Sequence, residues 1–274
     1  MKTSIPTVGK YASLIAASIA VLLPMTGLLF ASFKTGEEYA GSGAFDPPQN
    51  WLNFGNYLQA FEKGSMLQGF VNTTFIMLVS LAGTILIGTM AAYAIDRFDF
   101  RGKGAVLALF LLATLVPGVT TQVATFQIVN GLGLFNSPWA AIVLFTGTDI
   151  IAIYIFLQFM ATIPKALDEA ARIDGANHFT IYFRIILPLL KPAIATVVII
   201  KGIAIYNEFY IPFLYMPDPG LGVISTSLFR FKGPFGAHWE VLSAGAILVM
   251  IPTLVMFLFL QRFIYRGLAA GSVK

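Results

Sequence analysis

Long apolar stretches separated by short polar segments are the main pattern of this chain. A helix needs about 20 apolar residues to cross the roughly 30 Å hydrocarbon core of a bilayer. Six stretches of about that length occur, at residues 11–33, 72–95, 105–129, 139–160, 192–212 and 241–263. They are too long and too continuously apolar for barrel strands, in which apolar and polar side chains alternate. The pattern therefore predicts an all-α, polytopic membrane protein with six transmembrane helices.

Composition supports a membrane protein. Hydrophobic residues make up 57% of the 274 residues and charged residues 11%, with a mean hydropathy of +0.81. Soluble domains are about 45–50% apolar and about 25% charged. These values exclude a soluble domain, a disordered chain and a nucleic-acid-binding protein. The absence of cysteine excludes a disulfide framework and a Cys nucleophile, and two histidines, His178 and His238, are too few for a metal cluster.

Lysine and arginine indicate the orientation of the helices, because cytoplasmic loops carry an excess of both. Twelve of the 17 fall in the two termini and in the second-to-third and fourth-to-fifth connections, four fall on the other side, and Lys201 lies inside a predicted helix. Both termini are therefore predicted to be cytoplasmic. The first apolar stretch exceeds the usual 7–15 residues of a signal peptide, so we interpret it as a membrane helix.

The chain divides into three predicted parts. Residues 1–68 hold the first helix and an outer loop, residues 69–264 form the main transmembrane domain, and residues 265–274 form a cytoplasmic tail. Within the outer loop, residues 53–61 (NFGNYLQAF) are typical of a short amphipathic helix at the surface.

Catalytic motifs are absent from the sequence. It contains no GxxxxGK[ST] phosphate loop, no HExxH, GxSxG or GxGxxG motif, and no Ser, His and acidic residues grouped as a triad. The chain is therefore predicted not to be an enzyme, and energy for any transport would come from a partner.

The fourth-to-fifth connection, residues 163–188, has the pattern of a helix, a glycine turn and a second helix. Pro164 suits a first turn, Asp168 and Glu169 suit the positive end of a helix, and Gly175 suits a left-handed stop. A second helix is predicted from there toward Ile185. An interfacial loop on lipid would favour Lys and Arg on its polar face, whereas here acids nearly balance bases. The small side chains of Ala170 and Ala171 favour insertion into a groove of another protein.

These residues also carry a resemblance. They match a spaced pattern that consists of Glu-Ala-Ala, three residues, Gly, nine residues, Ile, one residue and Leu-Pro. The matching residues are Glu169, Ala170, Ala171, Gly175, Ile185, Leu187 and Pro188. The pattern resembles the EAA loop of permease subunits of binding-protein-dependent ABC importers. The six-span layout and the ending GLAAGSVK (267–274) are similar to the MalG-like permeases of carbohydrate importers, whose fold is a type I ABC importer transmembrane domain.

The resemblance implies a division of labour in a bacterial plasma (inner) membrane. A soluble sugar-binding protein would deliver substrate outside, this chain and a second permease subunit would form the pathway, and two cytoplasmic ATPase subunits would bind ATP and Mg. No cofactor is expected on this chain. Glu169, Ala170, Ala171 and Gly175 would lie in the ATPase groove, with Glu169 facing a basic residue. Ile185, Leu187 and Pro188 would join the loop to the fifth span, and residues 271–274 would reach the ATPase interface.

Polar residues inside the predicted spans are candidates for a substrate path. Asp149 and Lys201 lie at similar predicted depths, so they either pair or share a polar cavity, or Lys201 extends alone toward the interface. The other candidates are hydrogen-bonding or aromatic side chains that suit sugars, near a possible helix break at Pro117-Gly118: Gln122, Gln127, Asn130, Tyr206, Asn207 and Glu208. The same residue types also serve interhelical hydrogen bonds.

Three alternatives remain at the level of sequence. The cargo could be a polyol, glycerol phosphate or an acidic oligosaccharide. The chain could be a self-contained secondary transporter, for which paired inverted repeats are expected. An intramembrane enzyme would need a catalytic constellation. The sequence identifies neither the sugar nor the second permease subunit.

Overall fold

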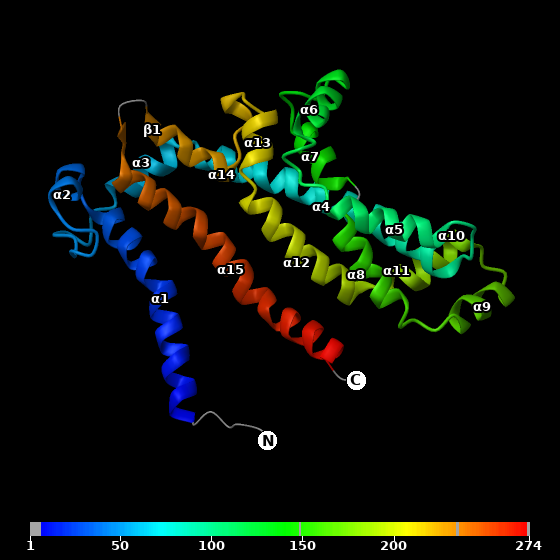
Figure 1. Cartoon of the computed structure of the whole chain (residues 1–274). Helices are drawn as coiled ribbons and strands as arrows, with labels where there is room; N and C mark the ends of the chain where they lie inside the picture. Colours follow the sequence, from blue (N-terminus) through cyan, green and yellow to red (C-terminus); the bar gives the residue numbers. More distant parts are fainter. Residues whose placement is uncertain (1–6, 148, 234–235, 273–274) are drawn as a thin grey trace. The chain divides into compact units, whose positions relative to one another are not determined.

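The computed structural model describes residues 7–147, 149–233 and 236–272, and most of the described backbone is helical (Figure 1). The chain forms two compact units. One contains residues 1–67 and 226–255, and the other contains residues 68–225 and 256–274.

The first unit combines one complete long helix and the first part of another with short outer elements. Its elements are α1 (Thr7–Phe33), α2 (Gly36–Gly41), α3 (Gly55–Lys63), η3 (Leu228–Phe231), β1 (Lys232–Gly233), β2 (Gly236–Ala237) and the first part of α15 (Trp239–Ser272). The two strands form one antiparallel ribbon, with Lys232 opposite Ala237.

The short helix α3 confirms the amphipathic helix predicted near residues 53–61. Asn56 fastens it to the end of α1, because its amide Nδ2 donates hydrogen bonds to the carbonyls of Ser32 (2.9 Å) and Lys34 (2.7 Å). Lys34 follows α1 and is only 1% exposed; its Nζ donates to Ser42 Oγ and to the Gly43 carbonyl, both at 2.8 Å. The outer segment is therefore ordered by specific hydrogen bonds.

The second unit is a helical bundle. Its elements are most of α4 (Met66–Arg97), then α5 (Lys103–Thr114), α6 (Gln122–Gly131), α7 (Pro138–Thr146), α8 (Ile150–Met160), α9 (Ala166–Ile173), α10 (His178–Ile181), η1 (Tyr182–Ile186), α11 (Leu187–Leu189), α12 (Lys191–Asn207), α13 (Tyr210–Tyr215), η2 (Pro219–Leu221) and the start of α14 (Ile224–Ser227).

Membrane-spanning helices are fewer in the described structure than the six predicted. Three helices are long and apolar enough to cross a bilayer, at Gly9–Phe33, Met66–Arg97 and Trp239–Phe259. Two bent pairs bring the number to five if each pair counts as one span: α7 with α8, and the His178–Leu189 segment with α12. The all-helical prediction is confirmed, whereas the count of six spans is not confirmed by the described residues.

The third and fourth predicted spans are both interrupted. The third, residues 105–129, is divided into α5 and α6 by residues 115–121, which contain the predicted break at Pro117-Gly118. The fourth, residues 139–160, was predicted as one helix and is bent by 42° between Thr146 and Ile150. Gly147 ends α7 with an extended ψ of 163°, and Asp149 caps α8. Two separate helices therefore replace the continuous one.

The core of the second unit lies where α8, α10 to α12 and the end of α4 meet. Phe156, Met160, Ile181, Ile186 and Leu190 are all 0% exposed there. Many exposed apolar side chains lie on the long helices α1, α4 and α15, as expected where lipid is the solvent.

Candidate functional site

The 163–188 loop forms the helix, glycine turn and helix predicted from its sequence. α9 ends at Ile173, and Gly175 takes the left-handed conformation with φ +83°, which is favourable for glycine because it lacks a Cβ atom. Asn177 then caps α10, its Oδ1 accepting a hydrogen bond from the Thr180 amide at 2.8 Å. Pro164 lies before the N-cap residue Lys165, so it precedes α9 rather than occupying its first turn.

The two faces of α9 have different surroundings. Asp168 and Ala171 are its only buried residues. Glu169 and Ala170 are exposed, and Ile173 is 87% exposed. The predicted residues are therefore divided: Glu169 and Ala170 face outward, whereas Ala171 packs on the core of its own chain.

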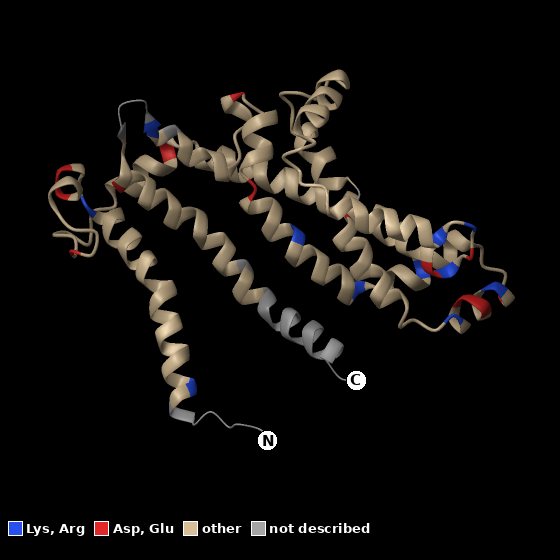
Figure 2. Ribbon diagram, in the orientation of Figure 1, with Lys and Arg blue, Asp and Glu red and all other residues tan. Residues whose placement is uncertain are grey.

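Charged side chains gather at this end of the second unit, where α4 ends, α5 begins and α9 lies (Figure 2). Arg97, at the end of α4, is the centre of an ion-pair cluster that the sequence analysis did not identify. Its Nε lies 3.0 Å from Oδ2 of Asp168 and its Nη1 lies 2.8 Å from Oδ2 of Asp96. In the sequence this cluster is visible only as Asp96 and Arg97 at the end of an apolar stretch, and Arg97 was used there only to predict the orientation of the helices.

The second half of the loop continues into the bundle. Residues 182–186 form a π-helical turn, and Ile186 is fully buried. Ile185 and Leu187 are partly buried against the core, and Pro188 lies in the first turn of α11. These residues connect the loop to α12 through short helical segments, which meet α12 at a break with a bend of 69°.

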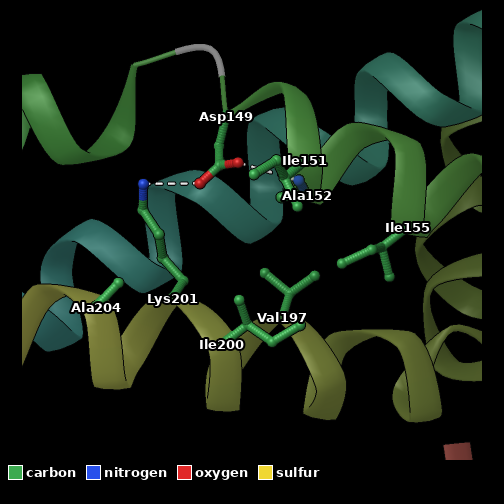
Figure 3. Close-up of a pocket in the computed structure, with 8 residues that line it drawn as sticks. All are labelled: Asp149, Ile151, Ala152, Ile155, Val197, Ile200, Lys201 and Ala204. Carbon is green, nitrogen blue, oxygen red and sulfur yellow. Dashed lines mark hydrogen bonds and ion pairs between the residues drawn. The ribbon is translucent and has the colours of Figure 1, made fainter. Parts of the chain in front are cut away.

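Asp149 and Lys201 form the ion pair that was one of the sequence alternatives. Lys201 extends from α12 toward Asp149 at the start of α8 (Figure 3), and its Nζ lies 2.7 Å from Oδ2. Oδ1 of the same carboxylate accepts the Ala152 amide at 3.0 Å. A cavity of about 170 Å³ beside the pair is lined mainly by aliphatic side chains, including Ile155, Val197 and Ile200.

A second cavity, of about 460 Å³, brings together Gln122 and Glu208 of the other candidates. Its lining also includes Thr121, Thr125 and Tyr215, and contains no lysine or arginine among the described residues. Burial, with a smaller contribution from Tyr210, raises the pKa of Tyr215 above its usual value. Glu208 Oε1 accepts the Tyr210 amide at 2.9 Å, which orients the carboxylate.

The remaining candidates are not part of this cavity. Gln127 and Asn130 are exposed on α6, and Asn207 is exposed with its Nδ2 donating to the Ile203 carbonyl at 2.9 Å. Tyr206 is buried, 8% exposed. α12 ends at Asn207, before the end of the predicted fifth span at residue 212. For the tail, α15 continues to Ser272, while the side chains of residues 260–274 lie outside the described part.

Comparison with known proteins identifies the class. Residues 84–270 match the family described as "Binding-protein-dependent transport system inner membrane component". The match covers most of the chain and includes α9, the glycine turn and α12. This chain belongs to that family and is a permease component of ABC transport systems.

Relatives are similar over almost their whole length. The chain is 32% identical over 266 residues to the melibiose/raffinose/stachyose import permease protein MelC of Bacillus subtilis, covering 96% of this chain and 95% of MelC. It is 31% identical over 262 residues to the arabinooligosaccharides transport system permease protein AraQ of Halalkalibacterium halodurans, covering 94% and 92% of the two chains.

A solved structure supports the fold. A bacterial ABC transporter chain involved in the import of the acidic polysaccharide alginate superposes with a TM-score of 0.82 at 18% identity, covering 93% of this chain and 95% of that one. The fold is therefore that of an ABC importer transmembrane domain.

Proposed function

We propose that the chain is the permease subunit of an ATP-driven carbohydrate importer and takes up the motion of a cytoplasmic ATPase through the 163–188 loop. The observation that carries the proposal is the division of α9 into an outward face and a face buried on its own core. A helix that transmits force needs a free surface for the motor and a fixed attachment to the bundle. Membership of the transport-system family indicates what kind of partner would dock there, namely the ATPase of an ABC importer.

The outward face has the chemistry for docking in a protein groove. Glu169 offers a carboxylate to a basic residue, Ala170 allows close approach, and Ile173 offers an apolar side chain that is 87% exposed. A Cβ atom added at Gly175 would meet no described atom within 4 Å, but the φ of +83° there disfavours any other residue. The turn therefore depends on glycine through its backbone conformation, and not through lack of space.

Variants of the outward face test the coupling. We expect Glu169→Lys to reduce copurification of the ATPase, since it would place a cation against a basic groove. We expect Gly175→Trp to leave the chain inserted but to lower the uptake rate at least about tenfold, which corresponds to about 1.4 kcal/mol of barrier height. Pull-down of the ATPase and sugar uptake measure the two effects.

Asp99→Lys is the matched control, because Asp99 is a cytoplasmic acid with a side chain 96% exposed. It should leave both copurification and uptake at the wild-type level. Unchanged ATPase binding in Glu169→Lys, together with normal uptake by inserted Gly175→Trp, would show that the loop does not couple transport to hydrolysis.

The proposed assembly contains this chain, a second permease subunit, two ATPase subunits that bind ATP and Mg, and an extracytoplasmic sugar-binding protein. The proposal includes six spans with cytoplasmic termini in a bacterial plasma membrane. On this topology α5 and α6 together form the third span, because α5 alone has 12 residues, or about 18 Å at 1.5 Å per residue.

The cargo we propose is a neutral oligosaccharide. Two relatives are named for oligosaccharide transport, and the 460 Å³ cavity offers hydroxyl, amide and carboxylate groups with no cation among its described lining residues. An anionic cargo would be repelled by Glu208 in the absence of such a cation. A neutral sugar can instead accept and donate hydrogen bonds there.

A sugar screen on the cognate soluble binding protein tests the cargo. We expect raffinose or an arabinooligosaccharide to raise its melting temperature, whereas glycerol phosphate and an alginate oligosaccharide should not. The opposite result, stabilisation by the acidic sugars alone, would exclude a neutral cargo and leave the coupling proposal unaffected.

A further inference from the structure

Arg97 contacts three separate groups with three different nitrogen atoms. Nε faces Asp168 in the first turn of α9 at 3.0 Å, Nη1 faces Asp96 at 2.8 Å, and Nη2 donates to the Ile163 carbonyl at 3.0 Å. The side chain of Arg97 is 5% exposed and that of Asp168 is 7% exposed. Arginine suits this role because its planar guanidinium presents donors in fixed directions, unlike the single ammonium of lysine.

The two contacts to the loop lie on either side of the start of α9. Ile163 precedes the helix, and Asp168 is its third residue. Holding a segment at both points restricts its rotation as well as its distance from α4. Neither oxygen of Asp168 accepts a hydrogen bond within the described part of the chain, so its burial is balanced by the charge of Arg97.

Few other contacts hold α9. The helix has eight residues, and a helix of that length is not stable in isolation. Its only buried side chains are Asp168 and Ala171. Ala171 contributes a single methyl group to the core, so the ion pair with Arg97 is the main contact that orients the helix.

We propose that Arg97 is a positioning residue that joins α9 rigidly to the cytoplasmic end of α4, so that movement of α9 is passed directly to the α4 span. The proposal rests on the coupling role of the 163–188 loop given above. It adds a second route for force, through α4, to the covalent route through α10 to α12.

Spin labels on α4 and α9 test the attachment. Because the chain has no cysteine, Leu86→Cys on α4 and Asp174→Cys at the end of α9 can be labelled in the full importer, with partner subunits freed of accessible cysteines. We expect the distances between the two spin labels to have a narrow distribution. This distribution should stay unchanged when ATP and vanadate trap the ATPases in their closed state, because both helices move as one body.

Variants of the ion pair should loosen the attachment. In Arg97→Gln the distribution should broaden and shift on trapping, while the ATPase still copurifies. Arg97→Lys should give an intermediate width, and the double exchange Arg97→Asp with Asp168→Arg should narrow the distribution again. Arg101→Gln is the matched control, since Arg101 is exposed nearby, and it should behave as the wild type.

Two results would overturn the proposal: a distribution as narrow in Arg97→Gln and Arg97→Lys as in the wild type, or a wild-type distance that changes on trapping. If Arg97→Gln does not fold, the lysine variant and the charge exchange decide the same question. Failure of the coupling role would appear differently, as normal ATPase binding and uptake in the Glu169 and Gly175 variants, with the spin-label result unchanged.

Discussion

At the scale of single residues, Asp149 shows how a charge can be accommodated within an apolar span. One of its oxygens caps α8 and the other pairs with Lys201. Both side chains are mostly buried, 13% and 22% exposed. Burying an unpaired charge at this depth costs free energy. Each member of the pair therefore lowers the cost of burying the other.

Removal of one partner should destabilise the protein more than removal of both. We expect Lys201→Met to lower the free energy of unfolding by about 2 kcal/mol, because a carboxylate then loses its charged partner. The double variant Asp149→Leu with Lys201→Met should recover part of this loss, since apolar replacement of both members of such a pair is often neutral. Thermal unfolding of the purified protein in detergent measures both.

Lys191→Met is the control, because Lys191 is an exposed residue at the start of the same helix. It should have little effect. Equal destabilisation by Lys191→Met and Lys201→Met would show that the pair does not contribute.

Sequence reasoning offered the Asp149–Lys201 ion pair as one of its alternatives and missed the Arg97–Asp168 ion pair. The Asp149–Lys201 pair could be predicted because charged residues are conspicuous within apolar stretches, and the rise of a helix per residue gives the depth of each charge in the membrane. Arg97 and Asp168 lie outside such runs, where charges are expected, and 71 positions separate them in the sequence. Only the tertiary structure shows that these two side chains are buried against each other.

At the scale of elements, hydropathy located the helices well but not their interruptions. Predicted helices at residues 11–33, 72–95 and 241–263 correspond to α1, α4 and α15. The bend between α7 and α8 was missed because Gly147 and Asp149 change the backbone direction while barely lowering the average hydropathy of the stretch. The turn at Gly175 was predicted because glycine readily adopts the left-handed backbone conformation that ends a helix, and Gly175 does adopt it.

Close packing of α4 against α7 depends on glycine. A Cβ atom at Gly83 would collide with the side chain of Thr146 on α7. Small residues allow such approaches between helices in membranes. We expect Gly83→Leu to destabilise the protein by about 1–3 kcal/mol through overpacking, measured as a lower melting temperature in detergent.

Gly104→Leu provides the comparison, because no described atom lies within 4 Å of a Cβ atom at Gly104 on α5. It should leave the melting temperature nearly unchanged. A larger effect at Gly104 than at Gly83 would contradict this account of the α4–α7 contact.

At the scale of the whole molecule, the distribution of Lys and Arg predicts which loops face the cytoplasm. Single cysteines in the cysteine-free chain test this orientation. A membrane-impermeant maleimide should label Leu52→Cys, which is 77% exposed in the first loop, in intact spheroplasts. It should label Asp99→Cys only after lysis. Labelling of Asp99→Cys before lysis would reverse the proposed orientation.

One side of α9 is exposed and the other is buried, so the two sides are expected to diverge differently among related permeases. Substitutions on its outward side, at Glu169, Ala170 or Ile173, change exposed side chains, whereas Asp168 and Ala171 are constrained by the core. If the outward side receives the motor as proposed, a permease can exchange one ATPase for another by changing a few side chains without refolding. A motor shared among several importers would, in turn, hold that same side constant while the transport path of each importer diversifies.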